Sequence, residues 1–210
     1  MTLFKKGPVP VRVGISFAAM LALVCAVGGE GRIGLGLLYA GLHELGHAGA
    51  MLLRKNKPHC LCLTAAGLRM ERSPGLGLSL HDETVIAAAG PLGSALFAGL
   101  AFAAFLLFSF PSGDLVSVPH GWLSWFLVQS IWLNAGFALF NLLPIRLLDG
   151  GRIVYFTLCR YMTEANAELW SRVLSGGCIV LVLAFAIYQS AAGKATLSLW
   201  AAAAYLLLNT

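Results

Sequence analysis

The residues with the clearest chemical potential are His43, Glu44 and His47, which stand in the run His-Glu-Leu-Gly-His. On a helix, positions i and i+4 share a face, so both imidazoles can bind one metal ion while the glutamate lies close by. The alternative is a pair of core histidines satisfied by backbone carbonyls. Three ionisable residues so close together in an apolar stretch are expensive in lipid and normally mark function. The motif therefore predicts a metal centre.

A catalytic zinc ion takes three protein ligands and leaves one position for water, so a third ligand is needed. Asp149 is the only carboxylate in the run Asn-Leu-Leu-Pro-Ile-Arg-Leu-Leu-Asp-Gly-Gly, which ends an apolar stretch heading for the same side of the membrane as His47. We expect Asp149 to be the third metal ligand. The alternative is an interfacial aspartate that pairs with Arg146 or Arg152.

Composition places this site in a membrane protein. Of the 210 residues, 59% are hydrophobic and 11% are charged, whereas soluble domains carry about 25% charged residues. The net charge of +5 comes from scattered residues, without the basic runs that a nucleic-acid interface needs. We expect one domain over residues 1–210 and no nucleic-acid partner.

The positioning elements should be transmembrane helices, which need about 20 mostly apolar residues each. The sequence predicts an all-α integral membrane protein, a bundle of six transmembrane helices, at about 11–29, 33–53, 84–110, 122–145, 172–190 and 195–209. The first stretch has an alternative interpretation as a signal peptide, but its apolar run is long and its cleavage site is poor.

Lysine and arginine indicate the orientation of these spans. If the N-terminus is cytoplasmic, every basic residue except Arg32 and Lys194 falls in a cytoplasmic segment. Basic residues concentrate on that side of membrane proteins. We expect a multi-pass protein of a bacterial inner or cell membrane, with both termini in the cytoplasm.

The segment between the second and third spans predicts a short β-hairpin at the membrane surface. Cys-Leu-Cys-Leu-Thr at 60–64 and Leu-Arg-Met-Glu-Arg at 68–72 read as strands around a turn. A free hairpin edge can bind an extended peptide, so Gly67 and Leu68 are candidate substrate-binding residues. A plain basic loop is the alternative. Cys60 and Cys62 suit either packing or a second metal site.

The fourth span carries two further candidates, Asn134 and Asn141, which lie seven residues apart on one helix face and could line a polar cleft. Asn141 could hold substrate backbone, or it could satisfy backbone groups freed by Pro144. Gly150 and Gly151 permit tight or left-handed turns beside Asp149.

The run His-Glu-Leu-Gly-His-Ala, the Ala-Gly-Pro-Leu at 89–92 and the run ending at Gly151 together resemble the site-2 protease family of intramembrane metalloproteases. They are most similar to the bacterial stage IV sporulation protein FB group. The resemblance covers a catalytic core of about 33–155. It implies one zinc ion per chain, held by His43, His47 and Asp149, with Glu44 as the general base.

The resemblance also implies hydrolysis of membrane-embedded or membrane-associated proteins near the cytoplasmic face, as in regulated intramembrane proteolysis of a sigma-factor precursor. Membrane-protein regulators would be further partners. Two features depart from the family. Ser94 stands where many members have asparagine, and the sporulation group often carries a C-terminal nucleotide-sensing domain that we expect this chain to lack.

Two other functions compete with a protease. A proteolytically silent membrane scaffold that captures transmembrane partners would have no reason to keep all four site residue types. A transporter would spread polar residues along several spans and show matching halves, and no internal repeat is visible.

Overall fold

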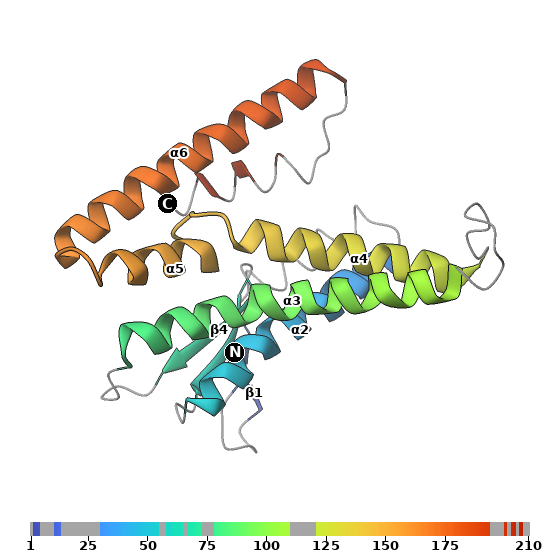
Figure 1. Ribbon diagram of the computed structural model, residues 1–210, viewed down its shortest axis with the longest axis horizontal. Coiled ribbons are helices and arrows are strands. Elements are labelled where there is room, and N and C mark those ends of the chain that lie inside the picture. The colour runs from blue at the N-terminus through green and yellow to red at the C-terminus, as the bar shows by residue number, and fades with distance from the viewer. Residues whose placement is uncertain are drawn as a thin grey trace. The chain divides into compact units, whose positions relative to one another are not determined.

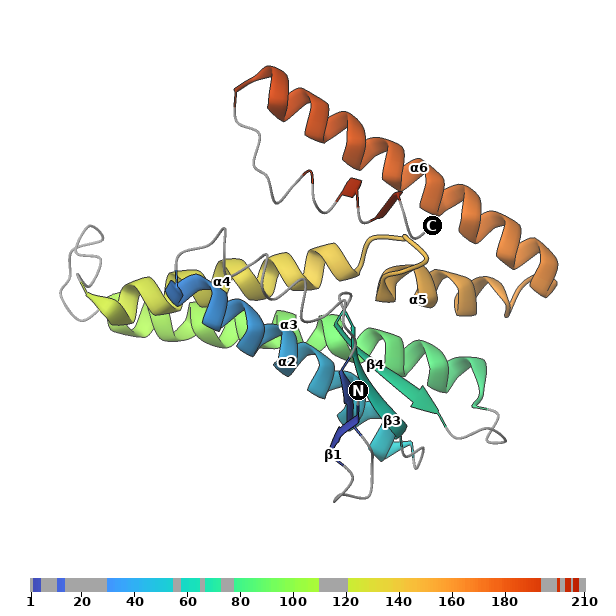
Figure 2. The ribbon, with the colours of Figure 1, turned by 180° about the vertical axis from the view of Figure 1, so that it is seen from behind.

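A computed structural model describes residues 2–4, 11–13, 30–54, 58–64, 67–72, 78–109, 121–193, 200, 203–204 and 206–207. The chain divides into two compact units. The first unit comprises Met1–Gly77 and Ala89–Ala138, and the second comprises Leu78–Ala88 and Leu139–Thr210. Figures 1 and 2 show the elements of both units from opposite sides.

A small four-stranded sheet belongs to the first unit. It consists of β1 (Thr2–Phe4), β2 (Val11–Val13), β3 (Pro58–Thr64) and β4 (Gly67–Arg72), in that spatial order. β1 and β2 are antiparallel, β2 and β3 are parallel, and β3 and β4 are antiparallel.

The β3–β4 hairpin occupies the segment where the sequence predicted one. Its strands pair in a register that places Thr64 opposite Gly67 and Leu61 opposite Met70. Each strand begins earlier than predicted, at Pro58 and Gly67.

Three helices complete the described part of the first unit. They are α2 (Glu30–Leu53), the part of α3 (Leu80–Ser109) that follows Ala88, and α4 (Trp122–Asn141) up to Ala138. They run side by side in both views (Figures 1 and 2). The Tyr39 hydroxyl donates a 2.5 Å hydrogen bond to Ser130 Oγ, which joins α2 to α4. α2 also contacts strand β4.

The distribution of polar and apolar side chains on helix α4 is that of a helix surrounded by lipid. Its buried residues include Ser124, Ser130 and Asn134, whereas Trp132 and Leu139 are exposed. A water-soluble helix would bury the large apolar side chains instead. Small and polar residues at helix contacts are typical of membrane bundles. The same exposure of large apolar side chains recurs on α3, at Leu92, Leu96, Leu100, Phe102 and Leu107.

Three helices of the described residues are long and apolar enough to cross a membrane: α3, α4 and α6 (Glu164–Ala191). The structure therefore supports a membrane protein but not the six spans that the sequence predicted. The second predicted span is present as α2, but the histidines, Glu44 and several glycines make it too polar to qualify by composition.

The two terminal spans of the prediction fall largely outside the described residues. Within the first of them, Val11–Val13 form strand β2 instead of a helix. Two valines in three residues favour a strand, because β-branched residues have high strand propensity. Of the last predicted span, only Trp200, 203–204 and 206–207 are described, and they are helical.

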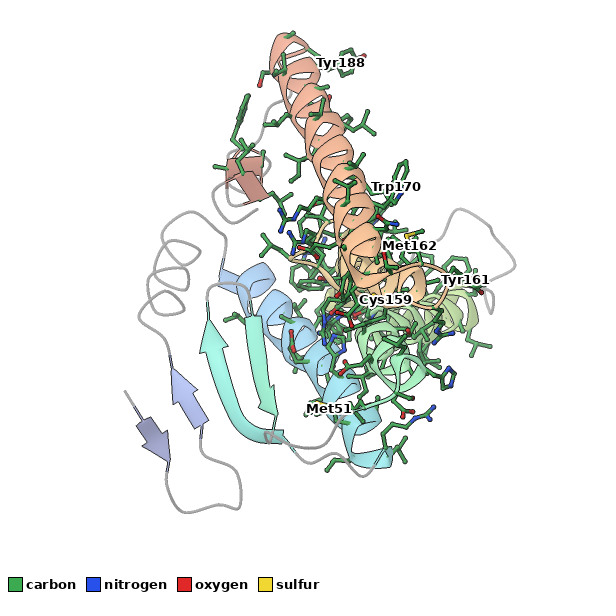
Figure 3. All side chains as sticks on the ribbon, turned by 90° about the vertical axis from the view of Figure 1, so that its left-hand side faces the viewer. Met51, Cys159, Tyr161, Met162, Trp170 and Tyr188 are labelled. Carbon is green, nitrogen blue, oxygen red and sulfur yellow. The ribbon has the colours of Figure 1, made fainter. Side chains whose placement is uncertain are left out.

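The second unit is built on α5 (Asp149–Leu158) and α6, which pack together (Figure 3). Its apolar cluster consists of Ile145, Leu148, Ile179 and Leu206. Trp170 and Tyr188 point outward along α6, and both are exposed.

A hydrogen bond and an ion pair connect the segment after α4 to helix α6. The Arg146 backbone N–H donates to Ser175 Oγ at 3.3 Å. The Arg146 side chain also binds Glu168 Oε1 at 2.6 Å, and Arg172 binds the same oxygen at 3.0 Å. These contacts fix the backbone that leads to Asp149.

Candidate metal centre

The imidazoles of His43 and His47 lie together on one face of α2. Both side chains are buried, with 4% and 7% of their surface exposed. Their ring centroids are 5.0 Å apart and the rings meet edge to face, at 79°. Each offers one ligand nitrogen, and the two nitrogens lie within 4.8 Å of each other. One turn of helix therefore brings the rings together, as the spacing predicted.

Gly90 of α3 creates the space that the two rings share. A Cβ added at Gly90 would lie 2.7 Å from His43 Nε2 and would also collide with His47 Nε2. Both Nε2 atoms therefore face the same point beside the Gly90 backbone. Sequence analysis did not identify this role of Gly90, because nothing in the sequence pairs position 90 with the histidines.

The other ring nitrogen of His43 is already engaged. His43 Nδ1 lies 2.9 Å from Ser94 Oγ, at hydrogen-bond distance. Ser94 follows Gly90 by four residues, so both lie on one face of α3. The Phe137 ring of α4 flanks His43 at a centroid distance of 6.5 Å. The histidine is thus held by α3 and α4 while its Nε2 stays directed at the shared space.

Helices α2 and α3 approach each other closely beside this space. A Cβ added at Gly46 would lie 2.8 Å from the Ala89 carbonyl oxygen and 3.3 Å from Gly90 Cα. Because these neighbours are backbone atoms, only glycine at position 46 allows α3 to approach so closely. Glu44 lies between the histidines in the sequence. Its side chain is partly buried and interacts with another group.

Asp149 is the first residue of α5, in the second unit, and it is buried. A helix N-terminus stabilises a carboxylate electrostatically. Arg152 Nη1 lies 3.8 Å from Asp149 Oδ1, an ion pair at the outer limit of such contacts. Of the two arginines considered as alternative partners, Arg152 makes this contact, whereas Arg146 binds Glu168.

Of the tight or left-handed turns predicted for the two glycines after Asp149, the structure shows a tight turn. Both are helical, and neither has a positive φ. A Cβ at Gly150 would collide with the Leu142 carbonyl, and one at Gly151 would collide with the carbonyl of Ile145. The chain therefore folds back tightly after α4, which ends at Asn141, three residues before Pro144. Close backbone approach, and not a left-handed turn, requires these glycines.

The four candidate substrate-binding residues lie on helix α4 and strand β4. Asn134 has no exposed surface, and its Nδ2 donates to the Ser130 carbonyl at 2.8 Å. Asn134 therefore lines no open cleft in this conformation. Asn141 is the last residue of α4 and belongs to the second unit. Gly67 and Leu68 begin strand β4, at the edge of the sheet.

Comparison with known proteins gives two likenesses. The model of Peptidase family M50 matches residues 113–185, which include Asp149 but not the His43–His47 motif. The structure is similar to that of the Site-2 Protease from Methanocaldococcus jannaschii, with a TM-score of 0.64 and 20% identity over 98% of this chain and 91% of that one. The search of curated proteins found no match. The chain thus has a site-2 protease fold, and residues 113–185 resemble Peptidase family M50.

Proposed function

We propose that this protein is an intramembrane zinc metalloendopeptidase of the site-2 type. The observation that carries the proposal is the convergence of two buried imidazole Nε2 atoms on a space kept open by Gly90. A purely structural histidine pair needs no such space. The helices around the pair expose large apolar side chains, as expected of a site that works within a bilayer.

Asp149 is the proposed third ligand. Two histidines and one carboxylate, each offering one ligand atom, form a donor set that could hold a metal ion. This combination suits a catalytic zinc ion, which keeps its fourth position for water. The match to the family model also covers Asp149. One zinc ion per chain is the expected stoichiometry.

The proposed reaction is hydrolysis of a peptide bond. A bound zinc ion lowers the pKa of water to about 7 and polarises a carbonyl group. Glu44 lies between the two histidines on α2 and is the proposed general base. Its carboxylate takes the proton from the attacking water and then delivers it to the departing amine nitrogen. His43 and His47 orient the site and accept no proton in this scheme.

The proposed substrates are membrane-embedded or membrane-associated proteins that are cut near the cytoplasmic face. Strand β4 lies at an edge of the sheet and contacts α2, the helix that carries both histidines. An edge strand presents unpaired backbone groups that can bind an extended peptide. Backbone binding at Gly67 and Leu68 would keep the substrate chain extended, and Asn141 could add a side-chain contact.

Cleavage of a sigma-factor precursor, as in the sporulation group, is the proposed biological role. It rests on the resemblance of the site motifs to that group. A bacterial cell membrane, cytoplasmic termini and membrane-protein regulators belong to the same proposal.

The experiment compares the purified native protein with Glu44→Gln on a candidate membrane substrate, with zinc measured in both. We expect about one zinc ion per chain in each, and cleavage by the native protein alone, because glutamine cannot take a proton. Equal cleavage by both would contradict the role of Glu44. A zinc-loaded native protein that binds substrates without cutting them would indicate a silent scaffold, and a native protein that binds no zinc would refute the proposal.

Asp149→Asn tests the third ligand separately. An amide oxygen is a weaker zinc ligand than a carboxylate, so zinc retention should fall. The fold should persist, because asparagine keeps the shape of the side chain. Unchanged zinc affinity would mean that another residue completes the site.

A further inference from the structure

The contact between Ser94 and His43 has a chemical consequence for metal binding. Neutral imidazole carries one N–H and one lone pair, so the nitrogen that binds a metal must be the one without the proton. In the native geometry, His43 Nε2 faces the space beside Gly90, while Nδ1 lies 2.9 Å from Ser94 Oγ. Metal binding through Nε2 therefore requires the proton to be on Nδ1.

We propose that Ser94 is a positioning residue that accepts a hydrogen bond from His43 Nδ1–H and thereby holds the ring in its metal-binding tautomer and orientation. This inference rests on the proposed zinc site. A serine oxygen has two lone pairs and can accept from the ring N–H. Ser94 has no exposed surface, so water cannot readily replace it.

The placement of Ser94 on α3 strengthens the argument. Gly90 and Ser94 are four residues apart, so one helix face supplies both the space at Nε2 and the acceptor at Nδ1. The two contacts fix His43 from both sides of its ring. His47 shares the space at Gly90.

The expected size of the effect follows from other metal sites, where removing an outer hydrogen-bond partner of a ligating histidine lowers metal affinity about 10–100-fold. Ser94→Ala removes only the hydroxyl, and it leaves the His43 Nδ1–H buried without its acceptor. Ser94→Thr keeps a hydroxyl at the same position and should restore most of the affinity.

The test measures the zinc dissociation constant of the full-length protein in detergent, by competition with a chelator. We expect Ser94→Ala to bind zinc about 10–100-fold more weakly than the native protein. The matched control is Ser124→Ala, which removes a buried serine hydroxyl that has no hydrogen-bond partner among the described residues. This control should keep native affinity. A loss of equal size in both variants would mean a general effect of cavities, and it would overturn the proposal.

A second measurement does not depend on any Ser94 variant. Nitrogen NMR of the metal-free native protein, with His43 assigned from His43→Gln, reports which ring nitrogen carries the proton. We expect the proton on Nδ1; a proton on Nε2 would overturn the proposal. A native protein that binds no zinc would instead refute the proposed function, so the two failures are distinguishable.

Discussion

Replacing Gly90 by alanine tests the space between the two histidines. The added methyl group would lie 2.7 Å from His43 Nε2, and contacts below 3.0 Å are essentially never observed for real Cβ atoms. The nearest atoms are the far ends of two side chains, so the rings can swing away without moving the backbone. We therefore expect Gly90→Ala to fold normally and to lose metal.

The size of the loss follows from the distances. His43 Nε2 must retreat from 2.7 Å to about 3.4 Å from the new methyl group, where ordinary van der Waals contact begins. Zinc–nitrogen bonds of about 2.0–2.1 Å tolerate deviations of only about 0.2 Å. Because both histidines are displaced, zinc affinity should fall by more than about 100-fold, beyond the effect of losing one outer hydrogen bond. Chelator competition and the zinc content of the purified protein measure this loss.

Gly93→Ala is the matched control for Gly90→Ala. It lies on the same helix, and its added Cβ would meet no described atom within 4 Å. Both variants gain about 0.5–1 kcal/mol of helix stability from the change of glycine to alanine. The melting temperature should therefore not separate the two variants, whereas zinc affinity should. Native zinc affinity in Gly90→Ala would refute the assignment of both Nε2 atoms to the shared space.

Two other glycines should respond in the opposite way, with a loss of stability. In Gly46→Ala the new methyl group would lie 2.8 Å from the Ala89 carbonyl oxygen, a backbone atom that cannot swing aside. The free energy of unfolding should therefore fall by about 1–3 kcal/mol. Gly49→Ala, whose added Cβ meets nothing within 4 Å in the described part of the chain, should not be destabilised. Equal melting temperatures for the pair would contradict the close approach of α2 and α3. In Gly151→Ala the new methyl group collides with the Ile145 backbone, so the free energy of unfolding should fall by a similar amount. A native melting temperature would show that the chain before α5 can relax.

The arrangement of the histidine pair could be predicted because it depends on local geometry. A spacing of four residues on a helix brings His43 and His47 to one face in any fold. The β-hairpin was similarly local, since alternating residues and a short turn define it. Asp149 could be named as a ligand from its motif, and its role as third ligand stays a prediction.

The roles of Gly90 and Ser94 could not be predicted, because they depend on how α3 packs against α2. Before the structure, Ser94 was only a departure from the family pattern. Its contact with His43 joins positions 51 residues apart in the chain, and one sequence holds no signal for such a pairing.

Two of the predicted spans differ from expectation in the described residues, because hydropathy judges each stretch alone. Residues Val11–Val13 are apolar enough to extend a predicted helix, yet they pair with β3 and form a strand. Similarly, α2 is helical but carries the polar residues of the site. Strand pairing decided the first case, and the polar residues of the site decided the second.

The parallel pairing of β2 with β3 constrains the side of the membrane on which the sheet lies. An open sheet does not lie in the hydrocarbon, where its edges would be unsatisfied, so neighbouring strands must lie on the same side of the membrane. Strands β2 and β3 therefore lie on the same side of the membrane. Whichever side holds the first strands also holds the β3–β4 hairpin, and a single reporter on either segment fixes the sidedness of both.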